Sequence, residues 1–172
     1  MSDEDLRAAL ADVARRLAAA EAVLAIQALK ARYGELVDRR FERGAVVPAA
    51  RLAELGAAIA ELFTEDGVWD GGPVLGVAEG RAAIAARLAE PTLVFSRHLF
   101  VSPSITVEGD RARGRWELLA PCKDAAGRSY WMCGIEEDEY ARDGLGVWRH
   151  ARMTLTTVTM APVGEGFDQI WC

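Results

Sequence analysis

The stretch SRHLFVSPSITVEGDRARGRWELL, residues 96–119, decides the fold class of this 172-residue chain. Aromatic and β-branched residues dominate 93–101 and 104–108, and Glu108-Gly109-Asp110 has the composition of a tight hairpin turn. After the turn, apolar and charged residues alternate: Ala112, Gly114, Trp116 and Leu118 on one face, and Arg113, Arg115 and Glu117 on the other. This period of two predicts antiparallel strands with one buried face.

The segments around this hairpin complete an α+β pattern. Further strands are expected at 128–141 and 147–161, with a turn at 143–146 between them. Three helices are expected before the strands: at 2–43, from Pro48 to about residue 63, and at 79–90. TEDG (64–67) is expected to end the second helix, and VWD (68–70) to be a short strand. Helices followed by an antiparallel meander indicate the α+β class.

The first helix carries an apolar stripe of its own. Ser2 and Asp5 are spaced as a capping box, and Gly34 and Gly44 are candidates for a bend and for the helix end. The stripe repeats at steps of three, four and seven residues: Leu6, Leu10, Val13, Leu17 and Leu24. Such a stripe packs either on its own domain or on a second subunit. We favour the subunit, because a helix of this length outreaches a small domain.

Composition excludes several classes of function. The net charge of −6 and pI of about 5.0 argue against a general nucleic-acid binder. Cys122, Cys133 and Cys172 are odd in number and lack CxxC spacing, so neither a structural metal site nor a disulfide framework is expected. No leader or membrane span is expected either, and the expected location is cytoplasmic. Without a phosphate-binding glycine loop or a GxSxG elbow, nucleotide and acyl-enzyme chemistry have no support.

His98 is the first candidate for chemistry, because it lies in the apolar run VFSRHLFVSP (94–103). It is either a core histidine bonded to backbone or a general acid/base, since its ordinary pKa lies near neutrality. Asp38 is the candidate carboxylate partner. Its spacing alone, however, favours an exposed acid paired with a neighbouring arginine. Tyr33 lies on the apolar stripe of its helix, so its hydroxyl needs a buried partner or a substrate oxygen.

The last expected strand carries two polar side chains on the same face as a tryptophan. Trp148, His150 and Arg152 alternate, and Glu136 and Asp138 share a face of the preceding strand. If this face is internal, the two acids could partner His150 and Arg152, because burying either unpaired is costly. The alternative is that this face of the sheet is exposed to solvent. Trp116 and Trp131 fit a core or interface better than a site.

These segments, in order, resemble the SnoaL-like proteins of the nuclear transport factor-like superfamily, which also contains scytalone dehydratase and the bile-acid dehydratases. The resemblance rests on AIQALKARYGELVDRR (25–40), IAELFTEDGVWD (59–70), GRAAIAARLAE (80–90), residues 96–119 and GVWRHARMTL (146–155). It implies a cone: a curved, mostly antiparallel sheet around an apolar pocket that N-terminal helices close. The corresponding division is a helical extension at 1–24, a cone domain at 25–162 and a tail at 163–172.

The resemblance also implies a site and an activity. His98 would line the pocket as the base, Asp38 would pair with it, and Tyr33 would contact the substrate. Arg152 matches a position that is often arginine, whereas His150 departs from an apolar position; with Trp116 they are the candidate substrate-binding residues. We therefore expect a dehydratase that needs no cofactor or metal and acts on a mostly apolar, carbonyl-containing small molecule, in a homo-oligomer that is a dimer or trimer. An isomerase or cyclase, a non-catalytic subunit of a ring-hydroxylating oxygenase, and a ligand carrier are the alternatives.

Overall fold

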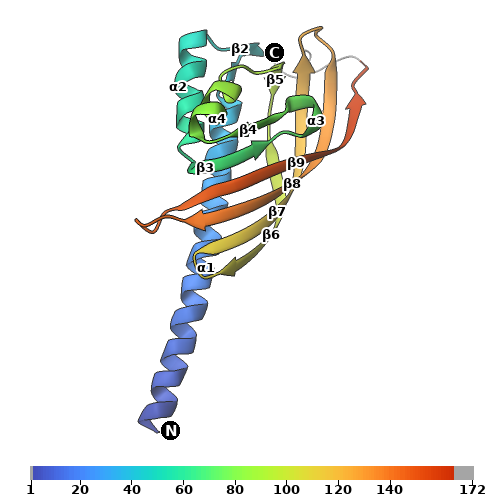
Figure 1. The fold of residues 1–172 in the computed structure, drawn as a ribbon. Helices are drawn as coiled ribbons and strands as arrows, with labels where there is room; N and C mark the ends of the chain where they lie inside the picture. Colours follow the sequence, from blue (N-terminus) through green and yellow to red (C-terminus); the bar gives the residue numbers. More distant parts are fainter. Residues whose placement is uncertain (1, 165–172) are drawn as a thin grey trace.

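A computed structural model describes residues 2–164, which form an α+β domain around one strongly curled sheet (Figure 1). The sheet has seven strands in the order β4-β3-β9-β8-β7-β5, and β6 also pairs with β7. All pairings are antiparallel except β3 with β9. The elements are α1 (Asp3–Asp38), β1 (Phe41–Glu42), β2 (Ala45–Val46), α2 (Ala49–Ala60), β3 (Phe63–Asp70), α3 (Gly72–Leu75), β4 (Val77–Glu79), α4 (Arg81–Leu88), β5 (Leu93–Ser96), β6 (Leu99–Glu108), β7 (Arg111–Asp124), β8 (Ser129–Arg142) and β9 (Trp148–Pro162).

The predicted cone fold is confirmed, with the helices against the curled sheet and the N-terminal part of α1 extending beyond it (Figure 1). The β6–β7 hairpin turns at Gly109, which has the positive φ of 62° that favours glycine. β5 and β6 both pair with β7 but are separate strands, so the expected strand at 93–101 is interrupted. The interruption consists of Arg97 and His98.

The capping box at Ser2 and Asp5 is present, and α1 continues through Gly34 without the expected bend. Gly34 serves a close approach instead, because an added Cβ would lie 3.3 Å from the ring of Phe100 in β6. The helix ends at Asp38, earlier than predicted, and a β1–β2 hairpin follows. That hairpin turns through Arg43 and Gly44, both of which have positive φ.

The interpretation of residues 64–67 as a helix stop was wrong. α2 ends at Ala60, and β3 already begins at Phe63. β3 pairs with β9, a partner far along the chain, at Phe63 and again from Val68 onward, and residues 64–67 are the irregular stretch between these paired positions. Propensity is a weak prior when a long-range strand pairing is available.

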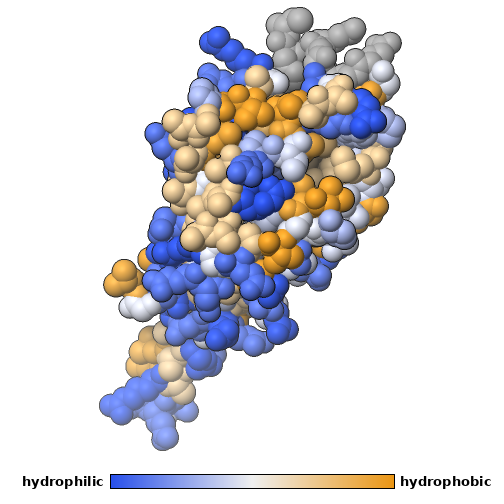
Figure 2. All heavy atoms as spheres, turned by 45° about the horizontal axis from the view of Figure 1, so that its top comes forward, coloured by the Kyte–Doolittle hydropathy of each residue, from blue (hydrophilic) through white to orange (hydrophobic). Residues whose placement is uncertain are grey.

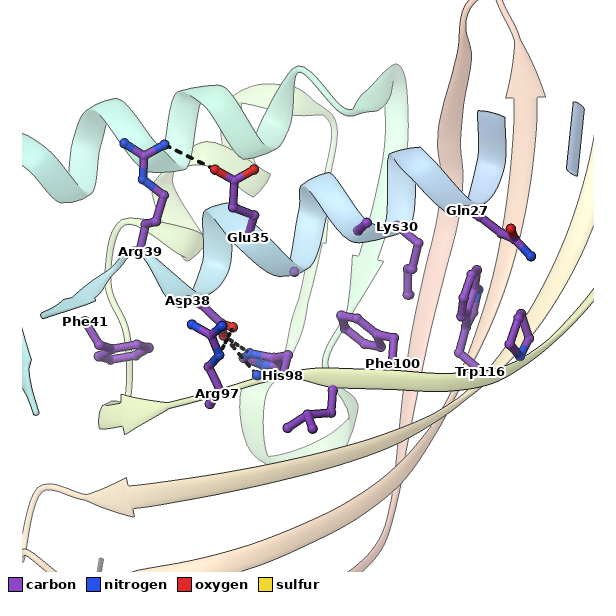
Figure 3. A pocket seen from close by; sticks show the side chains of 14 residues that line it. Gln27, Lys30, Glu35, Asp38, Arg39, Phe41, Arg97, His98, Phe100 and Trp116 are labelled. Carbon is purple, nitrogen blue, oxygen red and sulfur yellow. Dashed lines mark hydrogen bonds and ion pairs between the residues drawn. The ribbon is translucent and has the colours of Figure 1, made fainter. Parts of the chain in front are cut away.

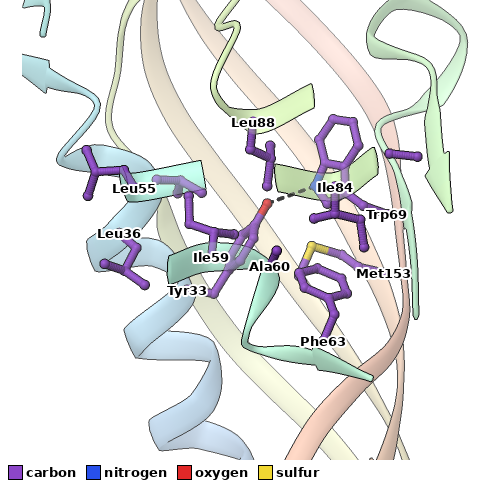
Figure 4. Packing of buried hydrophobic residues seen from close by; sticks show 12 residues of the cluster. Tyr33, Leu36, Leu55, Ile59, Ala60, Phe63, Trp69, Ile84, Leu88 and Met153 are labelled. Atoms are coloured by element: carbon purple, nitrogen blue, oxygen red, sulfur yellow. Dashed lines mark hydrogen bonds between the residues drawn. The ribbon is translucent and has the colours of Figure 1, made fainter. Parts of the chain in front are cut away.

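The main core lies where α1, α2 and α4 meet β3 and β9 (Figure 4). Its buried members are Tyr33, Leu36, Val37, Leu55, Ile59, Ala60, Phe63, Trp69, Ala78, Ile84, Leu88 and Met153. Burying each of the larger apolar side chains in this set stabilises the fold by about 1.5–3 kcal/mol. This packing fixes the C-terminal half of α1, and therefore its last residue, Asp38, against the sheet. Within residues 2–164, no helix is long and apolar enough to cross a membrane.

Candidate active site

His98 and Asp38, sixty residues apart in sequence, are in direct contact (Figure 3). The Nδ1 atom of His98 lies 2.8 Å from Oδ1 of Asp38, and the backbone N–H of His98 donates to the same oxygen at 3.0 Å. The guanidinium of Arg97 approaches the other carboxylate oxygen at 3.3 Å. With its side chain only 7% exposed, Asp38 is not the exposed acid that spacing suggested, and the arginine that it contacts is the distant Arg97. The two bonds to one residue fix both the place and the orientation of the imidazole.

The local fold explains this geometry. Asp38 is the last residue of α1, and His98 lies in the break between β5 and β6, where neither strand's pairing constrains it. The imidazole stacks on Phe100, with ring centroids 5.9 Å apart. Because Nδ1 is engaged by the carboxylate, the Nδ1–H tautomer is favoured, which leaves Nε2 as the basic nitrogen. Among the described residues, Nε2 has no hydrogen-bond partner.

His98 lines two spaces. One is an open groove of about 730 Å³ between α1 and β6, whose walls include Lys30, Asp38 and Phe100 (Figure 3). The other is an interior cavity of about 70 Å³ beneath the curled sheet. The cavity is mostly apolar: Trp69, Leu75, Leu88, Leu93, Leu118, Met132, Met153 and Leu155 contribute to its wall. A concave, mostly apolar space with polar side chains in its wall is the usual form of a small-molecule site.

Polar side chains also line the interior cavity; besides His98 they are Tyr33, Arg40, Asp70, Arg87, Thr92, Ser96 and Glu136. The Tyr33 hydroxyl accepts a hydrogen bond from Nε1 of Trp69 at 3.0 Å, and burial raises the pKa of this phenol, so its proton is retained. The Ser96 hydroxyl is buried and has no partner within residues 2–164. Guanidinium groups of Arg40 and Arg87 also line the wall, each donating to backbone carbonyls. Sequence reasoning missed Ser96, because nothing in its neighbourhood distinguishes it from any other strand serine.

A second missed feature is a buried cluster of charges around Lys30. This ammonium is 1% exposed and donates to Glu136 and, at 2.6 Å, to Asp138. Tyr140 also donates to Asp138, at 2.7 Å. The spacing of Lys30 from the buried residues Ile26 and Tyr33 of α1 was the available signal, since it places the lysine on their face. The acids expected to partner His150 and Arg152 are therefore bound to a lysine instead.

Burial and electrostatics within this cluster oppose each other. Desolvation raises the pKa of Asp138 to about 6, and the nearby charge of Lys30 only partly offsets this effect. Glu136 lines the interior cavity, whereas Lys30 lines the open groove. The cluster therefore forms part of the wall between the two spaces.

His150 is internal, as one of the two interpretations predicted, but it lies in the core rather than at either space. It is 0% exposed and contacts the rings of Tyr33, Phe63 and Tyr140. Neither ring nitrogen has a hydrogen-bond partner among the described residues, and Nδ1 lies 3.8 Å from Asp138. Desolvation, reinforced by the charge of Lys30, lowers its pKa well below the ordinary value, so the ring is neutral near pH 7.

The expectation that Arg152 shares the inner face with His150 was wrong. The β8–β9 register shifts between Glu139 and Tyr140, which pair with Arg152 and His150, so Ala151 is an extra residue. Such a bulge inverts the alternation of a strand. Met153 therefore points inward, and Arg152 is exposed on the other face of the sheet. Trp116 is buried and donates to Tyr140 at 3.0 Å, and one side of it lines the open groove.

Replacing His150 with phenylalanine should weaken the loss of stability in acid. Because the pKa of His150 is depressed in the folded protein, only the unfolded chain binds a proton at this residue below about pH 6.5, and stability falls as the pH falls. Below that point, His150 lowers the free energy of unfolding by about 1.4 kcal/mol per pH unit. Urea unfolding of both proteins between pH 7 and pH 5 measures the difference; equal slopes would contradict the buried neutral state of His150.

Residues 2–164 contain no group of three or more histidine, cysteine or acidic side chains placed to hold a metal ion. The candidate site consists of an oriented imidazole and its carboxylate beside a mostly apolar cavity, whose wall also carries hydroxyl, guanidinium and carboxylate groups. The fold and these groups define a cone-shaped α+β protein with an interior pocket.

The chain belongs to the SnoaL-like domain family, whose model matches residues 18–154. Its fold is similar to that of a nuclear transport factor 2-like protein from Novosphingobium aromaticivorans, at 28% identity and a TM-score of 0.65, over 87% of this chain and 88% of that one. It is also similar to a hexachlorocyclohexane dehydrochlorinase from Novosphingobium barchaimii, at 19% identity and a TM-score of 0.68, over 87% and 92%. The fold is similar as well to that of ActVI-ORFA from Streptomyces coelicolor, at 19% identity and a TM-score of 0.61, over 80% of this chain and 98% of that one. No match was found among curated proteins.

Proposed function

We propose that this protein is a cofactor-independent lyase that removes water from a mostly apolar, carbonyl-containing small molecule. The observation that carries the proposal is the contact of His98 with Asp38 at the wall of an apolar cavity. A neutral imidazole oriented by a carboxylate suits proton abstraction next to a carbonyl. The family match adds support, as does the fold shared with a dehydrochlorinase, whose name describes an elimination.

In the proposed reaction, Nε2 of His98 takes the proton from the carbon next to the carbonyl. The C–H electron pair forms the new double bond, and the bond from the neighbouring carbon to its hydroxyl breaks. The imidazolium, stabilised by Asp38, returns the proton to the departing hydroxyl, so the products are an unsaturated carbonyl compound and water. Tyr33, whose oxygen already accepts from Trp69, can donate its own proton to the carbonyl oxygen, and the unpartnered Ser96 hydroxyl can hold a second substrate oxygen.

The size of the cavity bears on the substrate. Small-molecule pockets usually measure about 300–1,000 Å³, whereas the interior cavity has about 70 Å³. A substrate with a ring system therefore requires the wall to rearrange. Met132 and Met153 in that wall are suited to this, because unbranched thioether side chains adapt at low cost.

The test is a panel of alicyclic and aromatic-fused β-hydroxyketones, incubated with the purified protein and analysed by mass spectrometry and NMR. Loss of one water with a new conjugated double bond is the expected result. A product of unchanged mass would replace the lyase proposal with an isomerase or cyclase that uses the same dyad. No conversion and no binding of any member would contradict the proposal and favour a non-catalytic family member.

Replacing Asp38 with asparagine should lower turnover about 10²-fold or more, because the amide can no longer stabilise the imidazolium or hold the required tautomer. Glu35→Gln is the matched control: this acid lies one turn earlier on α1, also lines the groove and pairs only with Arg32 and Arg39 among the described residues. Steady-state kinetics should show the control near wild type. Equal activity of all three proteins would exclude a role for the dyad.

A further inference from the structure

The N-terminal part of α1 presents an apolar seam that its own domain does not cover. Leu6, Leu10, Val13, Leu17 and Leu24 are 44%, 60%, 57%, 57% and 64% exposed. Figure 2 shows this part of the helix protruding at the bottom of the view, with apolar residues among hydrophilic ones. Exposed apolar patches of this kind mark interaction surfaces.

The seam cannot fold back onto the domain. At 100° per residue, these positions lie on the side of α1 opposite to Ala22, Ile26 and Tyr33, which the domain buries. One helix therefore carries two apolar faces in succession, the first turned away from the sheet. Whatever covers the first face must come from outside this domain.

The spacing of the seam specifies the occupant. Steps of four and three place Leu10, Leu17 and Leu24 at a positions and Leu6, Val13 and Ala20 at d positions of three heptads. A strict a/d seam fits another helix with the same repeat, packed knobs-into-holes. The segment of known sequence that carries this repeat is the same segment of a second copy.

Charges beside the seam specify the direction. Arg16 occupies a g position and Glu21 the following e position, so a parallel pair brings each Arg16 next to Glu21 of the other copy. An antiparallel pair with the leucines in register would instead place the two Arg16 side chains opposite each other. In this structure Arg16 reaches only Asp12 among the described residues, at 3.9 Å, and is 79% exposed, so it is available for such a pair.

We propose that residues 3–24 form a parallel coiled coil with the same segment of a second copy of this chain. The coiled coil holds the cone domains together at its C-terminal end. Because the seam faces away from the sheet, this association leaves the interior cavity of each domain intact. The proposal is independent of the reaction proposed above.

Disulfide trapping tests the register. In a Cys133→Ser, Cys172→Ser background, Ala20→Cys places a thiol at a d position, and Ala18→Cys places one at a b position facing away from the seam. Under mild oxidation, the Ala20→Cys protein should become a covalent dimer and the Ala18→Cys protein should stay monomeric on a denaturing gel. Antiparallel helices would separate the two introduced thiols by several turns. Failure of Ala20→Cys to cross-link would therefore overturn the proposal.

Sedimentation of the full-length protein tests the seam and the charges. Leu10→Ser with Leu17→Ser should reduce the mass to that of a monomer, whereas Leu145→Ser, at an 88% exposed turn position, should not. Arg16→Glu should weaken association, and adding Glu21→Arg should restore it. A monomeric wild type, or an oligomer whose mass the double serine variant leaves unchanged, would exclude the coiled coil.

Discussion

Turnover of the His98→Ala variant should fall about 10²–10⁴-fold, the usual contribution of a positioned general base. The reason is geometric: the variant keeps the cavity and Asp38 but has no group to accept the substrate proton. The measurement is kcat on the substrate found with the β-hydroxyketone panel, in variant and wild type. Added imidazole should restore part of the lost rate, because it can enter the space that the side chain vacates.

Two controls show whether the lost turnover reflects loss of the base rather than loss of folding or of substrate binding. Loss of the bond to the Asp38 carboxylate should lower the free energy of unfolding by about 1.5–3 kcal/mol, and thermal unfolding should remain cooperative. Substrate affinity should change less than kcat, since the base acts in the transition state. A variant that binds substrate and turns it over at the wild-type rate would remove His98 from the mechanism.

The Lys30→Met variant should lose about 3–5 kcal/mol of stability, because removal of the cation leaves two buried carboxylates uncompensated. Lys30 is the shared partner of Glu136 and Asp138, all three of which are buried. Urea unfolding at pH 7 measures the change. The loss should shrink as the pH is lowered towards the pKa of Asp138, about 6, since a protonated Asp138 no longer needs the ammonium.

Arg32→Met is the matched control on the same helix, because Arg32 pairs with Glu35 at the surface. An exposed pair of this kind contributes only about 0–1 kcal/mol. Adding Glu136→Gln and Asp138→Asn to Lys30→Met should recover part of the lost stability by neutralising the stranded acids. If Lys30→Met unfolds at the same urea concentration as wild type, Lys30 does not compensate the buried charges of Glu136 and Asp138.

Much of the architecture could be predicted from local signals. The alternation around Gly109 predicted the β6–β7 hairpin, the spacing of Ser2 and Asp5 predicted the first turn of α1, and the order of elements predicted the α+β class. These signals succeed because turn, cap and alternation are determined within a few residues. Two of the interpretations that failed, at residues 64–67 and at Arg152, concern strands whose partners are distant in sequence.

For the candidate site, too, local sequence patterns showed one part and the tertiary structure decided the other. The sequence by itself determined that His98 was an unusual residue in an apolar run, and that α1 carried an apolar stripe; the structure showed that its own domain leaves this stripe exposed. Only the tertiary structure decided that Asp38 is buried against His98, that Lys30 holds Glu136 and Asp138, and that a bulge at Ala151 turns Arg152 outward. The physical reason is that burial and charge pairing depend on which distant segments meet, whereas periodicity shows only which side of each segment is apolar.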